Sequence, residues 1–156
     1  MKKVMFISSQ GGHLTELLAL KSLFSKYDYQ VVTEKTKSSK YLKSAYGKKI
    51  SYLLYGTQDH LLPYLFIFSF NCIYSFILFL IYRPKAIITT GTHTAVPMCY
   101  IAKLFRSKVI WIETFANSQT PTKAGKMVYK IADKFVVQWP SMLEVYPKAE
   151  CWGWIF

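Results

Sequence analysis

Acidic residues are scarce in this sequence. Its 156 residues include 8 Asp and Glu against 20 Lys and Arg, which gives a formal net charge of +12. A charge balance of this kind suits an anionic partner, such as a phosphorylated ligand, a nucleic acid or an anionic membrane face. Disorder is excluded, because 52% of the residues are hydrophobic and 17% are aromatic, and so much apolar surface does not stay solvated.

Cysteines are also few, and the sequence shows no sign of a secretory leader. The three cysteines, Cys72, Cys99 and Cys151, are odd in number, far apart and without metal-ligand spacing. This usage predicts free thiols in a reducing compartment, with no disulfide framework and no metal site. After two initial lysines only four apolar residues precede Ser8, which is far fewer than a signal peptide needs. We therefore expect a location on the cytoplasmic side.

Short apolar runs alternate with helical patterns along the chain. Strands are predicted at residues 3–8, 29–33, 50–55, 85–91, 108–113 and 134–138, and helices at 14–26, 61–82, 95–105 and 121–132. Strands that alternate with helices are typical of a parallel sheet with right-handed crossovers. The sequence therefore predicts one doubly wound, Rossmann-like α/β domain over residues 1–156.

Residues 61–82 form a long hydrophobic run without a formal charge. Its length meets the roughly 20 residues that cross a bilayer. Three placements are open: a helix that spans the bilayer, a helix that lies on the membrane with one face in the lipid, and a crossover helix buried against protein. Predicted strands flank the run, and a span would pull them apart if both belong to one sheet.

The pattern within this run favours the membrane surface. A crossover helix normally has a polar outer face, but here the polar residues form a thin stripe of Tyr64, Asn71, Ser75 and Tyr82. Basic residues near the run attract anionic headgroups at about 1 kcal/mol each. These residues are Lys48, Lys49, Arg83, Lys85, Lys103 and Arg106.

A glycine pair, Gly11 and Gly12, followed by His13, lies between the first predicted strand and helix. Glycines let backbone N–H groups approach a ligand, and a helix N-terminus favours negative charge, so phosphate fits this turn. A histidine there is suited to phosphate contact or proton transfer. A tight turn whose histidine only caps the helix is the alternative. The Gly-x-Gly-x-x-Gly motif is absent, so we expect neither a nicotinamide nor another cofactor.

Three further candidates follow later strands. The hydroxyl-rich stretch 89–94 ends the fourth predicted strand, at the sheet edge where open α/β folds bind ligands. Glu113 follows the fifth strand, where a carboxylate either acts as a general base or binds a sugar hydroxyl, or simply pairs with a lysine. Gln138 and Trp139 close the sixth strand and are candidates for a partner or sugar contact, with core packing as the alternative for the tryptophan.

Four motifs occur in order: Gly-Gly-His-Leu from Gly11, Arg-Pro-Lys-Ala-Ile-Ile-Thr-Thr-Gly from Arg83, Ile-Glu-Thr from Ile112 and Phe-Val-Val-Gln-Trp-Pro from Phe135. Together they resemble the small bacterial capsular and exopolysaccharide glycosyltransferase subunits. Those are similar to the membrane-anchoring subunit of the eukaryotic enzyme that adds the second N-acetylglucosamine to diphosphodolichol. A more distant likeness is to the N-terminal half of the peptidoglycan N-acetylglucosaminyltransferase that makes lipid II. The resemblance covers residues 3–156.

The resemblance implies the N-terminal half of a GT-B glycosyltransferase, associated with the cytoplasmic face of the cell membrane. In that family this half holds a lipid-diphosphate acceptor, and the other half binds the nucleotide sugar. In the bacterial systems the other half is a separate chain of similar size. The implied partners are therefore a donor-binding subunit, a polyprenyl-diphosphate-linked saccharide and the membrane surface, with little transfer by this chain alone.

The resemblance also assigns roles to residues of this chain. His13 and Glu113 are the implied catalytic residues, and Glu113 corresponds to an acidic position after the fifth strand. The family's usual Gly-Ser-Gly-Gly-His loop reads Ser-Gln-Gly-Gly-His here. The residues that correspond to the acceptor-binding loops are Gly11, Gly12, His13, Gly91 and Thr92.

Two other functions compete with this interpretation. One is a self-sufficient small glycosyltransferase or hydrolase that uses His13 and Glu113. The other is a basic nucleic-acid-binding module, although the basic residues are spread evenly, with ten before residue 61 and ten after residue 82, and no nucleic-acid motif is present. We therefore expect no nucleic-acid partner.

Overall fold

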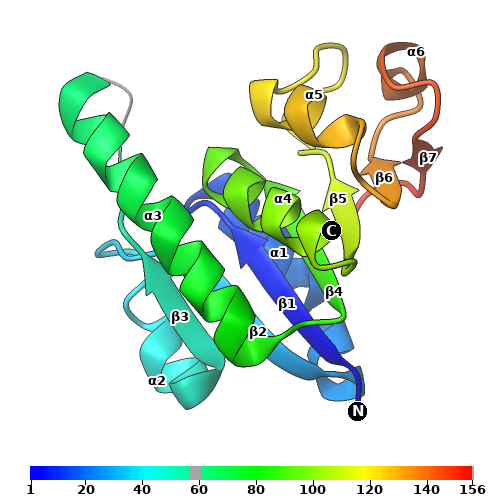
Figure 1. Ribbon diagram of the computed structural model, residues 1–156. Coiled ribbons are helices and arrows are strands. Elements are labelled where there is room, and N and C mark those ends of the chain that lie inside the picture. Colours follow the sequence, from blue (N-terminus) through cyan, green and yellow to red (C-terminus); the bar gives the residue numbers. More distant parts are fainter. Residues whose placement is uncertain (57–60, 156) are drawn as a thin grey trace.

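The computed structural model describes residues 1–56 and 61–155 (Figure 1). These residues form one seven-stranded parallel sheet in the order β3-β2-β1-β4-β5-β6-β7. The order reverses between β1 and β4, which is the point where open α/β sheets bind ligands. The doubly wound parallel sheet is thus confirmed. The strands are β1 (Lys3–Ser8), β2 (Asp28–Glu34), β3 (Ile50–Leu53), β4 (Ala86–Gly91), β5 (Lys108–Ile112), β6 (Lys134–Val137) and β7 (Glu150–Cys151).

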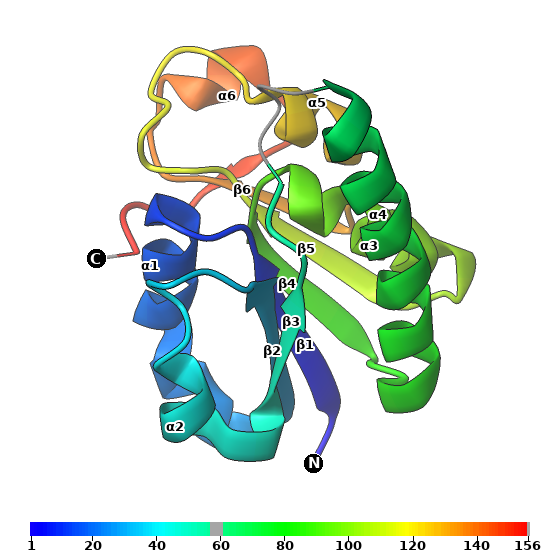
Figure 2. The same cartoon turned by 90° about the vertical axis from the view of Figure 1, so that its left-hand side faces the viewer.

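Helices cover both faces of the sheet, as Figure 2 shows for α1 and α2 on one side and α3 and α4 on the other. The first face carries α1 (Gly12–Ala19), η1 (Leu20–Lys26), α2 (Leu42–Tyr46) and η2 (Gly47–Lys49). The second carries α3 (Leu61–Tyr82), η3 (His93–Ala95), α4 (Val96–Leu104), α5 (Lys123–Tyr129) and α6 (Met142–Val145). A central strand that is buried on both faces needs a continuous apolar run, and β1 supplies it.

Successive side chains of β1 enter two separate hydrophobic cores. Met5 and Ile7 pack under α3, α4 and α5, whereas Val4 and Phe6 pack under α1 and η1. All four side chains are buried. The strand therefore holds both helical layers in place and carries the following loop to the edge of the sheet.

Helix α3 joins two strands of the same sheet and presents its polar stripe inward. Asn71, Ser75 and Phe79, four residues apart, are buried against the protein. The Asn71 side chain accepts a hydrogen bond from Leu54 N at 2.9 Å and donates one to Leu54 O at 2.8 Å. It thereby satisfies backbone groups just beyond the end of β3. Because polar groups occupy the protein side, the outer side is left apolar.

The outer side of α3 consists of large exposed hydrophobic side chains. They are Leu62, Leu65, Phe66, Phe70, Ile73, Phe76, Ile77, Leu80 and Ile81. The helix is long and apolar enough to cross a membrane, with 17% of its most hydrophobic window buried in the protein. Both ends lead to strands of one sheet, so a span would detach the helix from that sheet, whereas a position along the membrane surface leaves it intact.

Several elements differ from the sequence-based expectations. The helix expected at 14–26 is the α-helix α1 over Gly12–Ala19 followed by the 3-10 helix η1 over Leu20–Lys26. The strand β7 was missed, because two residues are too few for a periodic pattern. The short helices α2 and α6 were missed for the same reason. Helix α5 spans Lys123–Tyr129 rather than 121–132, since Thr122 caps its start by accepting a hydrogen bond from Gly125 N. Strand β3 ends at Leu53 rather than at residue 55.

Candidate functional site

Two loops meet at the carboxyl edge of the sheet, after β1 and after β4. Ser9 N donates a hydrogen bond to Gly91 O at 2.9 Å, and Thr92 N donates one to Ser9 Oγ at 3.1 Å. The loops therefore form one unit at the point where the strand order reverses. This arrangement brings together the predicted residues 11–13 and 91–92.

His13 is tied to the second loop through the backbone of Thr90. Its Nδ1 donates to Thr90 O at 2.8 Å, and Thr90 Oγ1 donates to His13 O at 2.6 Å. A carbonyl only accepts, so Nδ1 carries the proton and Nε2 is left as the other ring nitrogen. A Cβ added at Gly91 would lie 3.5 Å from His13 Nδ1, and Gly91 has φ +93°. The space would admit a Cβ at ordinary contact distance, so it is the positive φ that favours glycine at this position.

The glycine pair before His13 faces open space. A Cβ added at Gly11 or Gly12 would meet no atom within 4 Å among the described residues. Gly11 has φ +81°, a conformation that side-chain-bearing residues adopt at a cost. The backbone is therefore accessible directly before the N-terminus of α1, an eight-residue helix, where an anion is favoured.

Glu113 lies below the loops and is almost fully buried, with 1% of its surface exposed. Trp111 Nε1 donates to its Oε2 at 2.9 Å, and Thr122 N donates to its Oε1 at 3.3 Å. Burial raises the pKa of this carboxyl, although hydrogen bonds from Thr122 and Trp111 oppose the shift. Its contacts tie it to the start of α5 and leave almost none of its surface exposed.

Gln138 and Trp139 connect the end of β6 to neighbouring loops. Gln138 is buried, and its Nε2 donates to Glu16 Oε2 and to Glu113 O, both at 3.0 Å. Trp139 is partly exposed, donates from Nε1 to Phe115 O at 2.8 Å and packs its ring on Phe115. Of the pair, Trp139 has the exposed surface, and its buried part packs against the hydrophobic core under α4 and α5.

Two buried carboxylates at this edge were not singled out from the sequence. Glu34, at the end of β2, accepts from Gln10 N at 3.1 Å and from Thr94 Oγ1 at 2.5 Å. Burial lowers the pKa of the neighbouring His93, whose Nε2 lies 3.8 Å from Glu34 Oε1. Glu16 of α1 accepts from Thr114 Oγ1 at 2.7 Å. The sequence contains a pattern that points to Glu34, since this carboxylate follows apolar strand residues just as Glu113 does.

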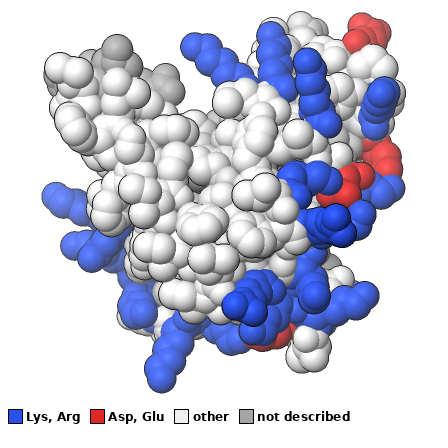
Figure 3. Space-filling view, in the orientation of Figure 1, with Lys and Arg blue, Asp and Glu red and all other residues white. Residues whose placement is uncertain are grey.

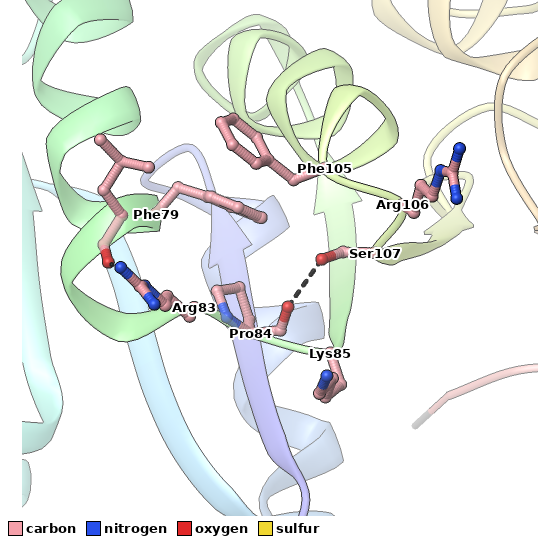
Figure 4. Close-up of a pocket in the computed structure, with 8 residues that line it drawn as sticks. Phe79, Arg83, Pro84, Lys85, Phe105, Arg106 and Ser107 are labelled. Atoms are coloured by element: carbon pink, nitrogen blue, oxygen red, sulfur yellow. Dashed lines mark hydrogen bonds between the residues drawn. The ribbon is translucent and has the colours of Figure 1, made fainter.

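A cavity of about 370 Å³ lies at the opposite edge of the sheet, where α3 ends and β4 begins (Figure 4). Phe79 and Phe105 form its apolar wall, and Ser107 Oγ donates to Pro84 O at 2.7 Å beneath it. Three cationic residues, Arg83, Lys85 and Arg106, also line it, and among the residues that the structure describes no carboxylate does. Basic side chains therefore stand at the end of the exposed apolar helix.

Comparison with models of protein families assigns this chain to a family. The model of the family described as "Oligosaccharide biosynthesis protein Alg14 like" matches residues 4–155, nearly the whole sequence. The chain belongs to the Alg14-like family.

Eukaryotic proteins are among the named relatives of this chain. The UDP-N-acetylglucosamine transferase subunit ALG14 of Mus musculus is 25% identical over 173 aligned positions, which cover 94% of this chain and 80% of the mouse protein. The subunit of the same name from Candida albicans is 34% identical over 93 positions, and these cover 56% of this chain and 42% of the fungal one. This Alg14-like chain thus spans less than half of the fungal relative.

Solved structures share the fold of this Alg14-like chain. MurG from Acinetobacter baumannii superposes with a TM-score of 0.71 at 17% identity, over 90% of this chain and 43% of MurG. The UDP-N-acetylglucosamine 2-epimerase from Rickettsia bellii superposes with a TM-score of 0.73 at 16% identity, over 99% of this chain and 45% of the epimerase. In both cases the present chain corresponds to less than half of the larger protein.

Proposed function

We propose that this Alg14-like chain is the acceptor-binding, membrane-docked subunit of a two-chain glycosyltransferase. A partner chain of similar size binds the UDP-sugar, and the cleft between the two chains is the active site. The observation that carries the proposal is the fold match, in which nearly all of this chain corresponds to 43% of MurG. The relatives' name, UDP-N-acetylglucosamine transferase subunit, supports a chain that works with another.

The acceptor site in this proposal is the pair of loops at the carboxyl edge. The open backbone at Gly11 and Gly12 receives the diphosphate, and the loop of Gly91 and Thr92 borders it. His13 is anchored through Nδ1, which leaves Nε2 to accept a proton from the attacking sugar hydroxyl or to contact phosphate. Both loops meet at this edge, so one ligand reaches all of these groups.

We assign Glu113 a positioning role within the proposed site. Both carboxylate oxygens accept hydrogen bonds, and the residue is 1% exposed. A self-sufficient enzyme that uses His13 together with Glu113 therefore has less support than the two-chain assembly. Trp139, together with the exposed Trp152 and Trp154, supplies an aromatic surface for the partner or the sugar.

The membrane-facing side in this proposal is the outer face of α3. Figure 3 shows a continuous surface without charged side chains over α3 and α4, with Lys and Arg gathered along its lower margin. Large apolar side chains enter the lipid, while Arg83, Lys85 and Arg106 meet anionic headgroups. The net charge of +12 fits the cytoplasmic face of the cell membrane.

We further propose that the transfer serves the synthesis of a capsular polysaccharide or exopolysaccharide. A polyprenyl-diphosphate-linked saccharide suits both the apolar helix and the phosphate-sized loop site. Synthesis of a capsular or exopolysaccharide repeat unit uses an acceptor of this class. The family match supports the transferase-subunit assignment, and the choice of polysaccharide rests on the sequence resemblance alone.

A reconstitution assay tests the proposed function. Transfer from UDP-N-acetylglucosamine to a polyprenyl-diphosphate-linked saccharide is measured with this chain, with its donor-binding partner chain, and with both on vesicles. We expect transfer only from the mixture. His13→Ala should lower the turnover of the mixture by about 100-fold or more, while the two chains still co-elute in gel filtration. Full transfer by this chain alone would refute the two-chain proposal.

A further inference from the structure

A groove of about 520 Å³ opens between the N-terminal part of α3 and the helix α5, on the same edge as the two loops. In Figure 3 a hollow lies between the upper end of α3 and the part of the molecule that carries α5. Its volume lies within the range of ligand pockets. The lining residues are Tyr64, Phe68, Thr92, His93, Val96, Lys123, Ala124 and Met127.

One wall of the groove is apolar and belongs to the membrane-facing helix. Tyr64 and Phe68 form this wall, and their rings stack at 5.9 Å between centroids. Leu65 and Phe66, on the same turn of α3, are exposed outside the groove. The groove wall is therefore continuous with the apolar outer face of α3, and an apolar chain can pass from one to the other without crossing a polar surface.

The opposite wall carries the polar and cationic groups. Thr92 and His93 continue the loop that Ser9 holds by its hydrogen bond to Thr92 N. Lys123, at the start of α5, is exposed and has no carboxylate within 4 Å among residues 1–56 and 61–155. A free ammonium group thus lies at the rim of the groove, on the polar wall with Thr92 and His93 and beside the proposed diphosphate site.

We propose that this groove binds the first isoprene units of a polyprenyl diphosphate acceptor, and that Lys123 pairs with the diphosphate. This assignment rests on the proposed function and adds a route for the lipid. The diphosphate lies at the Thr92 end, the first isoprene units pack on Phe68 and Met127, and the rest of the chain follows α3 into the bilayer. Charge complementarity favours this occupant, because the groove combines one unpaired cation with an apolar wall.

Binding of two probes to the full chain in mild detergent tests the groove. Farnesyl diphosphate carries both the anion and isoprene units, and inorganic diphosphate carries the anion alone. The variants are Lys123→Ala, which removes the cation, and Met127→Asn, which makes the exposed rim polar. Lys126→Ala is the matched control, because this lysine is also exposed on α5 but does not line the groove.

We expect the wild-type chain to bind farnesyl diphosphate at least about tenfold more tightly than inorganic diphosphate. Lys123→Ala should weaken both probes by about tenfold, and Met127→Asn should weaken only farnesyl diphosphate, by about fivefold. Lys126→Ala should change neither. Unchanged affinities in both groove variants would overturn the groove assignment, and the proposed function would stand if these variants still bind a polyprenyl-diphosphate-linked saccharide. A wild-type chain that binds neither lipid-linked ligand would refute both proposals.

Discussion

Three buried glutamates hold the loops at the carboxyl edge of the sheet. Glu34 accepts from the first loop and from Thr94 beyond the second, Glu16 accepts from Thr114, and Glu113 accepts from Thr122 at the start of α5. A buried carboxylate is tolerated only where donors surround it. The hydrogen bonds to each carboxylate offset the free-energy cost of burying it and hold a loop in place. Together the three glutamates shape the edge on which the proposed acceptor site lies.

Gly125 is the residue at which this arrangement is least tolerant of change. A Cβ added there would lie 2.2 Å from Glu113 Oε2 and 2.8 Å from Thr122 Oγ1, which is inside contact distance. We expect Gly125→Ala to lower the free energy of unfolding by about 1–3 kcal/mol. Urea denaturation measures the change.

Gly12→Ala is the matched control for that experiment. A Cβ at Gly12 meets nothing within 4 Å, and the residue opens helix α1, so alanine should leave stability unchanged or raise it by about 0.5 kcal/mol. Equal stability of the Gly125 and Gly12 variants would contradict the packing of Glu113 under α5.

The predicted site residues were accessible to sequence reasoning only where a local pattern marks them. The sequence predicts that three glycines lie at the sheet edge, because Gly11 and Gly12 come after an apolar strand and Gly91 ends one. The bond between His13 and Thr90 joins residues 77 positions apart and leaves no local signal. The same holds for Gln138, whose buried amide donates to Glu16 of α1 and to the carbonyl of Glu113, just after β5.

At the scale of elements, α3 reverses the usual polarity of a crossover helix. Its polar side chains, Asn71 and Ser75, face the protein, and its large apolar side chains face outward. The composition of residues 61–82 predicted the helix and its apolar surface. The direction in which the polar stripe points was not predictable, because it depends on the hydrogen bonds between Asn71 and the backbone of Leu54, just beyond the end of β3.

The outward face of α3 can be tested on vesicles. Phe66 and Ile73 are 77% and 63% exposed, so glutamates there should change the free energy of unfolding by less than about 0.5 kcal/mol. Each inserted apolar side chain contributes about 1.5–3 kcal/mol, so Phe66→Glu with Ile73→Glu should lower vesicle affinity by at least about 100-fold. Co-sedimentation with anionic phospholipid vesicles measures it.

The control for the vesicle assay is Tyr41→Glu. Tyr41 is 58% exposed and precedes α2, which packs on the other face of the sheet. This variant should co-sediment like the wild-type chain. If the double variant also pellets fully with the vesicles, α3 is not the membrane-docking element and a different surface carries the attachment.

At the scale of the whole molecule, the two ends of the sheet have different chemistry. The carboxyl edge carries the open glycine loops and the groove beside α3, and the opposite edge carries Arg83, Lys85 and Arg106. Helix α3 runs between these edges along one side of the molecule (Figure 1). A molecule laid on the membrane along α3 thus keeps its basic edge and its loop edge both near the headgroup layer.

In the proposed assembly this chain holds the lipid-linked acceptor, and the donor site belongs to another polypeptide. Titration calorimetry on the purified chain tests it directly, with a polyprenyl-diphosphate-linked saccharide in one experiment and UDP-N-acetylglucosamine in another. We predict saturable binding of the lipid-linked saccharide and no measurable heat with the UDP-sugar. Tight binding of UDP-N-acetylglucosamine by the chain alone, without binding of the lipid-linked saccharide, would contradict the account.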